Sequence, residues 1–189
     1  MYKRILAAGI VLAILCAVMV THATTEKCQK ACEAKKACNS PKPLATKNMV
    51  HIAVIVRDVE KASKAWADLF GMEVPQWSLN DPPEKSNILY RGKTTDARLK
   101  TAFLKFDNLR VELMEPVGGP SIWMDFLQTK GEGVHHIAFD VKGIEEQIAN
   151  IESWGMPLVQ RGEWTVYTGG CYTYFESEPQ LGVILELLE

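Results

Sequence analysis

Two histidines and two glutamates recur at matching places in the two halves of the sequence. His51 and His136 each open a His-Ile-Ala run, while Glu112 lies in VELMEP and Glu186 in LELLE. An unpaired carboxylate among Val and Leu neighbours is costly to bury, so two of them at equivalent places need a shared counter-charge. We therefore predict that His51, Glu112, His136 and Glu186 bind one divalent metal ion.

Two imidazoles and two carboxylates form a ligand set that suits Zn, Ni, Co, Mn or Fe and leaves positions for water or substrate. The metal identity stays open. Taken alone, a histidine on an apolar strand is more often a core residue, and each glutamate could pair with Lys or Arg across a sheet or face solvent. The double repetition favours the metal site.

The elements that must position these residues also repeat. The segment VHIAVIVRDVEKASKAWADLFGMEV from Val50 matches HHIAFDVKGIEEQIANIESWGMPLV from His135. Each reads as a strand, a polar turn and a helix that ends at a Gly-Met pair. The expected buried helix faces are Val59, Ala62, Trp66 and Leu69 in the first copy, and Ile144, Ile148, Ile151 and Trp154 in the second.

Further strands are expected over 101–106 and 110–116 in the first half, and over 173–177 and 182–189 in the second. A short helix over 121–130, capped by Ser121, joins the halves. The segment 77–98 reads as a loop with one strand at most. The predicted fold class is α+β, with paired βαβββ modules over about 48–117 and 133–189.

The N-terminal region has the layout of a secretory signal. Lys3 and Arg4 precede an apolar run, and small residues follow up to Ala23. We predict a signal peptide over 1–23 that is cleaved after about Ala23, a polar Cys-rich arm over 24–45 and the main domain over 46–189. The protein is then periplasmic or secreted, with no stable membrane span after cleavage; the alternative is a membrane anchor formed by an uncleaved leader.

Export would place four cysteines, Cys28, Cys32, Cys38 and Cys171, in an oxidising compartment, where disulfides are expected. Their connectivity is open: Cys171 could tie the arm to the domain, or one thiol could pair between chains in a homodimer. The formal net charge of -2 without long charge runs argues against a nucleic-acid partner. A small-molecule substrate is the expected partner.

Three segments, VELMEPVGGPS, GEGVHHIAFDV and GVILELLE, resemble the vicinal oxygen chelate superfamily (glyoxalase, bleomycin-resistance and extradiol dioxygenase proteins). The likeness covers about residues 48–189 and is greatest to methylmalonyl-CoA epimerase-like proteins. It implies a half-barrel sheet around one metal held by the four predicted ligands. His136 is preferred to His135 because it is in register with His51, which leaves His135 as a structural neighbour.

The resemblance implies a metal-dependent isomerase or epimerase, or a glyoxalase-type lyase, acting through a metal-stabilised enolate. Glu186 is the leading catalytic base, and Glu112 is a ligand with a second base role. The alternatives are a non-catalytic small-molecule binding module of the bleomycin-resistance type and an Fe-dependent dioxygenase. Export and the acidic pair Glu176 and Glu178 count against a phosphate-rich carrier, so the substrate stays open.

Overall fold

The computed structural model describes residues 42–44, 46–165 and 170–189. The predicted signal peptide and nearly all of the Cys-rich arm lie outside the described residues, as do Cys28, Cys32 and Cys38. Cys171 lies half-buried on a strand. None of the helices in the described segments is long and apolar enough to cross a membrane.

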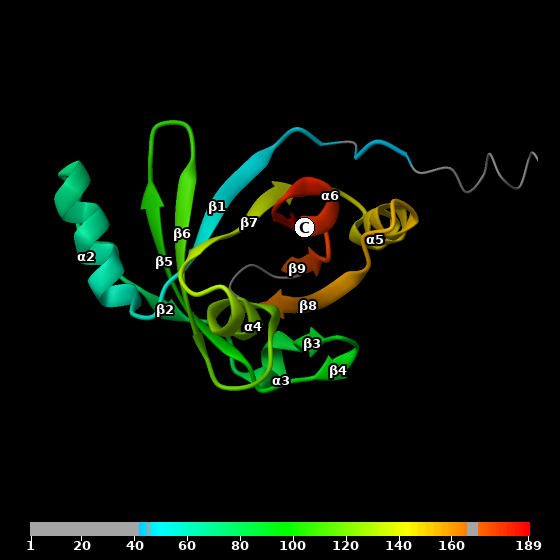
Figure 1. The fold of residues 1–189 in the computed structure, drawn as a ribbon, viewed down its shortest axis with the longest axis horizontal. Coiled ribbons are helices and arrows are strands. Elements are labelled where there is room, and N and C mark those ends of the chain that lie inside the picture. Colours follow the sequence, from blue (N-terminus) through cyan, green and yellow to red (C-terminus); the bar gives the residue numbers. More distant parts are fainter. Residues whose placement is uncertain (1–41, 45, 166–169) are drawn as a thin grey trace, which may run out of the picture. The chain divides into compact units, whose positions relative to one another are not determined.

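A mixed sheet forms the centre of the fold and curls into a half-barrel, with few helices around it (Figure 1). Its ten strands run in the order β2-β5-β6-β1-β7-β10-β9-β8-β3-β4. The first module contributes β1 (Met49–Ile55), α2 (Val59–Phe70), β2 (Ser78–Leu79), β5 (Arg98–Lys105) and β6 (Arg110–Val117). The second contributes β7 (Gly133–Asp140), α5 (Ile144–Ser153), β8 (Leu158–Trp164), β9 (Gly170–Phe175) and β10 (Ile184–Leu188).

The two modules have the same strand order. In the first, β1 pairs in parallel with β6, and the order continues to β5 and β2; in the second, β7 pairs in parallel with β10, and the order continues to β9 and β8. The modules meet where β1 and β7 pair antiparallel. This arrangement confirms the predicted α+β fold of paired βαβββ modules.

Local capping explains where the main helices begin and end. The Asp58 side chain accepts a hydrogen bond from the backbone of Lys61 at 2.9 Å at the start of α2, and Gly71 ends that helix with a φ of 65°. The linking helix α4 (Ile122–Thr129) begins at Ser121, whose hydroxyl accepts from the backbone of Met124 at 3.1 Å. The predicted Ser cap is therefore confirmed.

The predicted helix faces are correct except at their last turns. Val59 and the three isoleucines of α5 are buried, and Ala62 and Trp66 pack against the core. Leu69 is instead 78% exposed, because Ser63 and Ala67 occupy the inner face of α2. Trp154 is half exposed because α5 ends at Ser153, and the indole nitrogen of Trp154 donates to the backbone oxygen of Lys42 at 2.8 Å.

The segment 77–98 holds more regular structure than its sequence predicts. Besides β2 it contains α3 (Pro83–Ser86), β3 (Leu89–Tyr90) and β4 (Lys93–Thr94). Strand β3 pairs with β8 of the second module. The first module therefore contacts the second at the centre of the sheet and again at its far edge.

The concave face of the sheet carries the residues of interest. Along β1 the buried residues alternate as His51, Ala53 and Ile55, so these side chains share one face. Helix α4 covers part of this face and packs Trp123 and Phe126 into the same apolar cluster as Ala53 and Ile55. Helices α2 and α5 pack on separate clusters of buried residues. A short helix, α6 (Glu178–Leu181), precedes β10.

Candidate metal centre

Strand register brings all four predicted ligands together on the concave face. On β1, Ala53 lies opposite both Glu112 on β6 and His136 on β7. On β7, Ala138 lies opposite both His51 on β1 and Glu186 on β10. The fully buried alanines leave room for the longer side chains beside them to converge.

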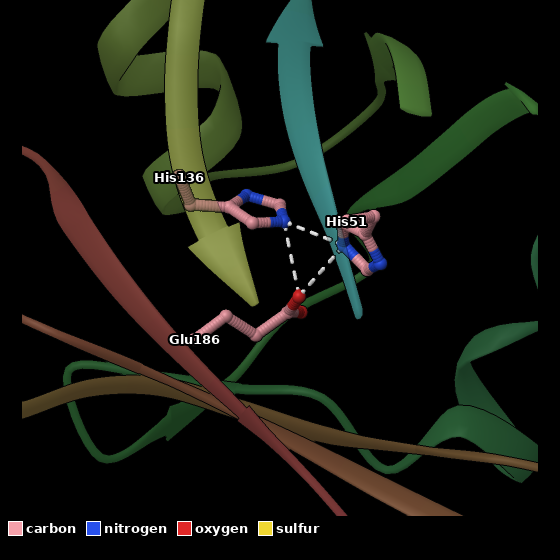
Figure 2. A group of neighbouring side chains, drawn as sticks. All are labelled: His51, His136 and Glu186. Carbon is pink, nitrogen blue, oxygen red and sulfur yellow. Dashed lines mark hydrogen bonds and ion pairs between the residues drawn. The ribbon is translucent and has the colours of Figure 1, made fainter. Parts of the chain in front are cut away.

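Three of these residues form a compact triangle. Figure 2 shows His51 from β1, His136 from β7 and Glu186 from β10 pointing toward one another. The two imidazole Nε2 atoms are 3.0 Å apart, and the Glu186 Oε2 atom lies 3.0 Å from each of them. All three side chains are buried. Their ligand atoms lie within 4.8 Å of one another, as a common cation requires.

Glu112, the fourth predicted ligand, lies beside this triangle. Its Oε2 atom is 3.0 Å from the Nε2 atom of His51 and 3.9 Å from that of His136. The side chain is also buried. The geometry therefore gives a close set of two imidazoles and one carboxylate, with a second carboxylate in contact with it.

The donor set fits one divalent cation. Bonds of about 2.0–2.2 Å from a metal to imidazole nitrogen and carboxylate oxygen place neighbouring ligand atoms roughly 3 Å apart, the spacing found here. The Glu186 Oε2 atom is buried and accepts no well aligned hydrogen bond from the described residues. Buried imidazole nitrogens and carboxylate oxygens that converge on one point in this way are arranged as metal ligands are.

A proton balances the charge when no cation is present. Burial by itself would lower the pKa of His51, but the close contacts with Glu112 and Glu186 and their negative charges outweigh it and raise the pKa to about 10. Burial acts to raise the pKa of Glu186, yet His136 and His51 hold it well below its usual range. A divalent cation would displace the proton on His51, so metal affinity depends on pH.

Tyr174 supports the carboxylate of Glu186 from the neighbouring strand. The two residues are in register between β9 and β10, and the Tyr174 ring lies 5.0 Å from the ring of His136. Burial, with the charges of Glu186 and Glu112, raises the pKa of the Tyr174 hydroxyl. The hydroxyl therefore stays protonated beside that carboxylate.

Two residues that the sequence analysis did not single out lie beside the site. Arg110 is opposite His51 in the register of β1 and β6, and its guanidinium lies 5.4 Å from the ring of Phe103. That ring is 6.1 Å from the ring of His51. Both side chains are exposed. Strand alternation could have found Arg110, because it precedes Glu112 by two residues and so shares its face.

Comparisons with known proteins agree with this fold. The family described as "Glyoxalase/Bleomycin resistance protein/Dioxygenase superfamily" matches residues 50–175. The chain is 24% identical over 139 residues to the protein YqjC of Bacillus subtilis, a match that covers 74% of this chain and 89% of YqjC. It is 29% identical over 103 residues to mouse mitochondrial methylmalonyl-CoA epimerase, covering 54% of this chain and 50% of the epimerase.

Among solved structures, methylmalonyl-CoA epimerase from Mycobacterium tuberculosis aligns with a TM-score of 0.55 at 19% identity, over 78% of this chain and 91% of that one. This likeness shows the shared fold. The chain therefore belongs to the glyoxalase/bleomycin resistance protein/dioxygenase superfamily. Within it, the chain is close to methylmalonyl-CoA epimerase-like proteins, although it spans only about half the length of the mouse enzyme.

Proposed function

We propose that this protein is a metal-dependent isomerase or epimerase, or a glyoxalase-type lyase, that removes and returns a proton beside a carbonyl group. The observation that carries the proposal is the convergence of His51, His136 and Glu186 at 3.0 Å, with Glu112 in contact. Relatives named as epimerases support the same reaction class.

A bound divalent cation would act as a Lewis acid that stabilises negative charge on a substrate oxygen. The protein residues bind the cation and balance its charge. His51 and His136 hold the cation as neutral ligands, and the buried carboxylates balance its charge. The apolar cluster under α4 limits water at the concave face, which strengthens electrostatic interactions there.

The two carboxylates are the proposed proton carriers. The sequence ranks Glu186 first as the base and Glu112 second. The distances favour the reverse order, because Glu186 lies 3.0 Å from both imidazole nitrogens whereas Glu112 is that close only to His51. A carboxylate with fewer close contacts needs less movement to accept a proton. Separate Glu112→Gln and Glu186→Gln variants, both assayed for deuterium exchange into methylmalonyl-CoA, distinguish the two orders.

We propose a small anionic substrate for this site. Arg110 places a cation beside His51, and the exposed ring of Phe103 offers an apolar wall. A carboxylate or thioester-bearing acid has the matching chemistry. Glu178, one of the two acidic residues that count against a phosphate-rich carrier, forms an ion pair with Lys130, so its charge is partly neutralised.

The metal content of the full chain tests the proposal. We would purify it without chelators and measure bound metals by mass spectrometry, beside a variant carrying His136→Ala and Glu186→Ala. We expect about one equivalent of a transition metal in the parent and loss of that metal in the folded variant. If the parent binds no metal after incubation with Zn, Ni, Co and Mn, the enzyme proposal is wrong. A binding module of the bleomycin-resistance type is then the better interpretation.

An Fe-dependent dioxygenase is the second candidate, and one observation favours it. The compact triangle consists of two histidines and one carboxylate, the ligand set of many non-haem Fe(II) oxygenases. The nearby Glu112 carboxylate argues against it, because such sites keep those positions for oxygen and substrate. Oxygen consumption by the Fe(II)-loaded protein with a catechol would favour the dioxygenase, and its absence alongside proton exchange would favour the isomerase.

Export through the N-terminal signal is also a proposal, with a periplasmic or secreted mature protein. It depends on the basic and apolar pattern of residues 1–23. N-terminal sequencing of the protein recovered from the periplasm or medium tests it. A mature N-terminus near residue 24 supports cleavage, whereas a full-length, membrane-associated protein would support the anchored alternative.

A further inference from the structure

His135 lies in an unusual position for a strand residue. In the register between β1 and β7, Ala53 pairs with His136 but Val54 pairs with Val134, so His135 is an extra, unpaired residue. Such a β-bulge changes the direction of the side chain it carries, and bulges are frequent next to active sites. Here the consequence is that the neighbouring residues His135 and His136 are both fully buried.

The bulge brings the two rings into direct contact. The Nδ1 atom of His135 lies 2.8 Å from the Nδ1 atom of His136. Since the Nε2 atom of His136 points at His51 and Glu186, its Nδ1 atom is the only one left for a partner on the other side. One of the two Nδ1 atoms must donate and the other accept.

The His135 ring is packed beside His136, edge-on to Phe126 at 5.0 Å and to Tyr174 at 5.8 Å. A His136 ring whose Nε2 lone pair faces the proposed ion carries its proton on Nδ1, so His135 is the acceptor of the pair. A His135 tautomer with its proton on Nε2 leaves the Nδ1 lone pair free to accept.

We infer that His135 is a positioning residue that accepts the Nδ1 proton of His136 and thereby directs the Nε2 lone pair of His136 at the metal. The inference rests on the proposed metal site and adds to it a residue that does not touch the ion. Partners of this kind fix the tautomer and orientation of ligating histidines, and their loss typically weakens metal binding by about 10–100-fold.

Two substitutions at this position separate the hydrogen bond from packing. His135→Phe keeps an aromatic ring between Phe126 and Tyr174 but has no acceptor. His135→Asn places an amide oxygen on the same Cγ atom that carries Nδ1, so it keeps the acceptor and loses the ring. Phe126→Leu is the control, because it disturbs the packing of His135 without removing any polar atom.

The first measurement is the Zn affinity of the four full-length proteins, by competition with a chelating dye. We expect about a 10–100-fold loss in His135→Phe, recovery to within a few-fold of the parent in His135→Asn, and little change in Phe126→Leu. Circular dichroism shows whether each variant is folded. A folded His135→Phe protein with parental affinity would overturn the inference.

The second measurement is the tautomer of His135 in the metal-free parent, by ¹⁵N NMR of the histidine rings at pH 8. A proton on Nε2 of His135 and none on its Nδ1 atom is the expected result, and a proton on Nδ1 of His135 contradicts it. This readout is independent of metal. Failure of the parent to bind Zn would therefore count against the proposed function alone, while the wrong tautomer would count against His135.

Discussion

At the scale of single residues, protonated His51 balances the negative charge of the site when no metal is bound. In the metal-free protein Glu112 and Glu186 raise the pKa of this imidazole from 6.5 to about 10. A group whose pKa is higher in the folded than in the unfolded protein stabilises the fold. This contribution is fully present at pH values below the unfolded pKa, and it is lost as the pH rises through the folded pKa. For Glu186 the sign is opposite, because its pKa is lowered and its contribution is lost in acid.

We expect the chelated, metal-free protein to lose stability between pH 6.5 and about 10, by up to roughly 4 kcal/mol in the free energy of unfolding. Urea unfolding at pH 6, 8 and 10 in the presence of EDTA measures this. The His51→Gln variant has no imidazole to titrate, so its profile should be flatter over the same interval. Equal slopes in the two proteins would contradict the assignment of this charge to His51.

Arg110 carries a separate prediction about ligand binding. The substitution Arg110→Met keeps an unbranched side chain beside Phe103 and removes the guanidinium charge that lies 5.4 Å from its ring. Since a charge-assisted hydrogen bond contributes about 1.5–3 kcal/mol, we expect roughly 10–150-fold weaker binding of malonate to the Zn-loaded protein and unchanged Zn content. Calorimetric titration gives the affinity. Lys93→Met removes an exposed cation on β4 and should leave malonate binding unchanged. An equal loss of malonate affinity in Lys93→Met would show that the overall charge of the protein, and not Arg110 itself, determines binding.

At the scale of elements, the site depends on two alanines in the central strand pair. Ala53 and Ala138 occupy the sheet positions between the ligands and are fully buried. Larger residues there would push the ligand side chains apart. We therefore expect the proposed site to need the repeated His-Ile-Ala run on both strands, because each strand carries a predicted ligand together with the small residue opposite a predicted ligand of its partner.

We expect Ala138→Leu to lose metal binding in addition to about 1–3 kcal/mol of stability through overpacking. Ala102→Leu is the matched control, because Ala102 is equally buried but lies in the cluster under α2, away from the ligands. Both variants should unfold at lower urea concentrations, and only Ala138→Leu should fail to bind Zn. Retained Zn binding in a folded Ala138→Leu protein would contradict the proposal that the site needs a small residue at position 138.

Helices and strands with a clear hydrophobic period could be predicted from the sequence, whereas very short strands could not. The repeat starting at Val50 and His135 predicted both strand-helix units and the convergence of the four predicted ligands. Strands β3 and β4, with two residues each, carry too few positions to show any alternation. The bulge at His135 was also hidden, because the pairing partner that reveals it lies on another strand. Single-strand patterns contain no information about register between strands.

At the scale of the whole molecule, the candidate site joins the two modules. His51 and Glu112 come from the first module, and His136 and Glu186 from the second. A cation bound by all of them would be lost on unfolding either module. Metal binding should therefore stabilise the modules together.

We expect Zn at 1,000 times its dissociation constant to raise the free energy of unfolding by about 4 kcal/mol. Thermal unfolding of the parent with Zn and with EDTA measures the difference. Glu186→Gln, which keeps the size of the side chain and removes its charge, should show little increase. Two separate transitions in the Zn-loaded parent, only one of them shifted, would show that the modules do not share the ion.

The second contact between the modules, where β3 pairs with β8, has a mechanical consequence. A hinge that opened the half-barrel at the β1–β7 seam would also have to peel β3 from the far edge of the sheet. The β1–β7 and β3–β8 pairings therefore both resist a movement that would open the half-barrel. Under the proposed function, we therefore expect the half-barrel to admit a substrate without opening and to select among substrates by size.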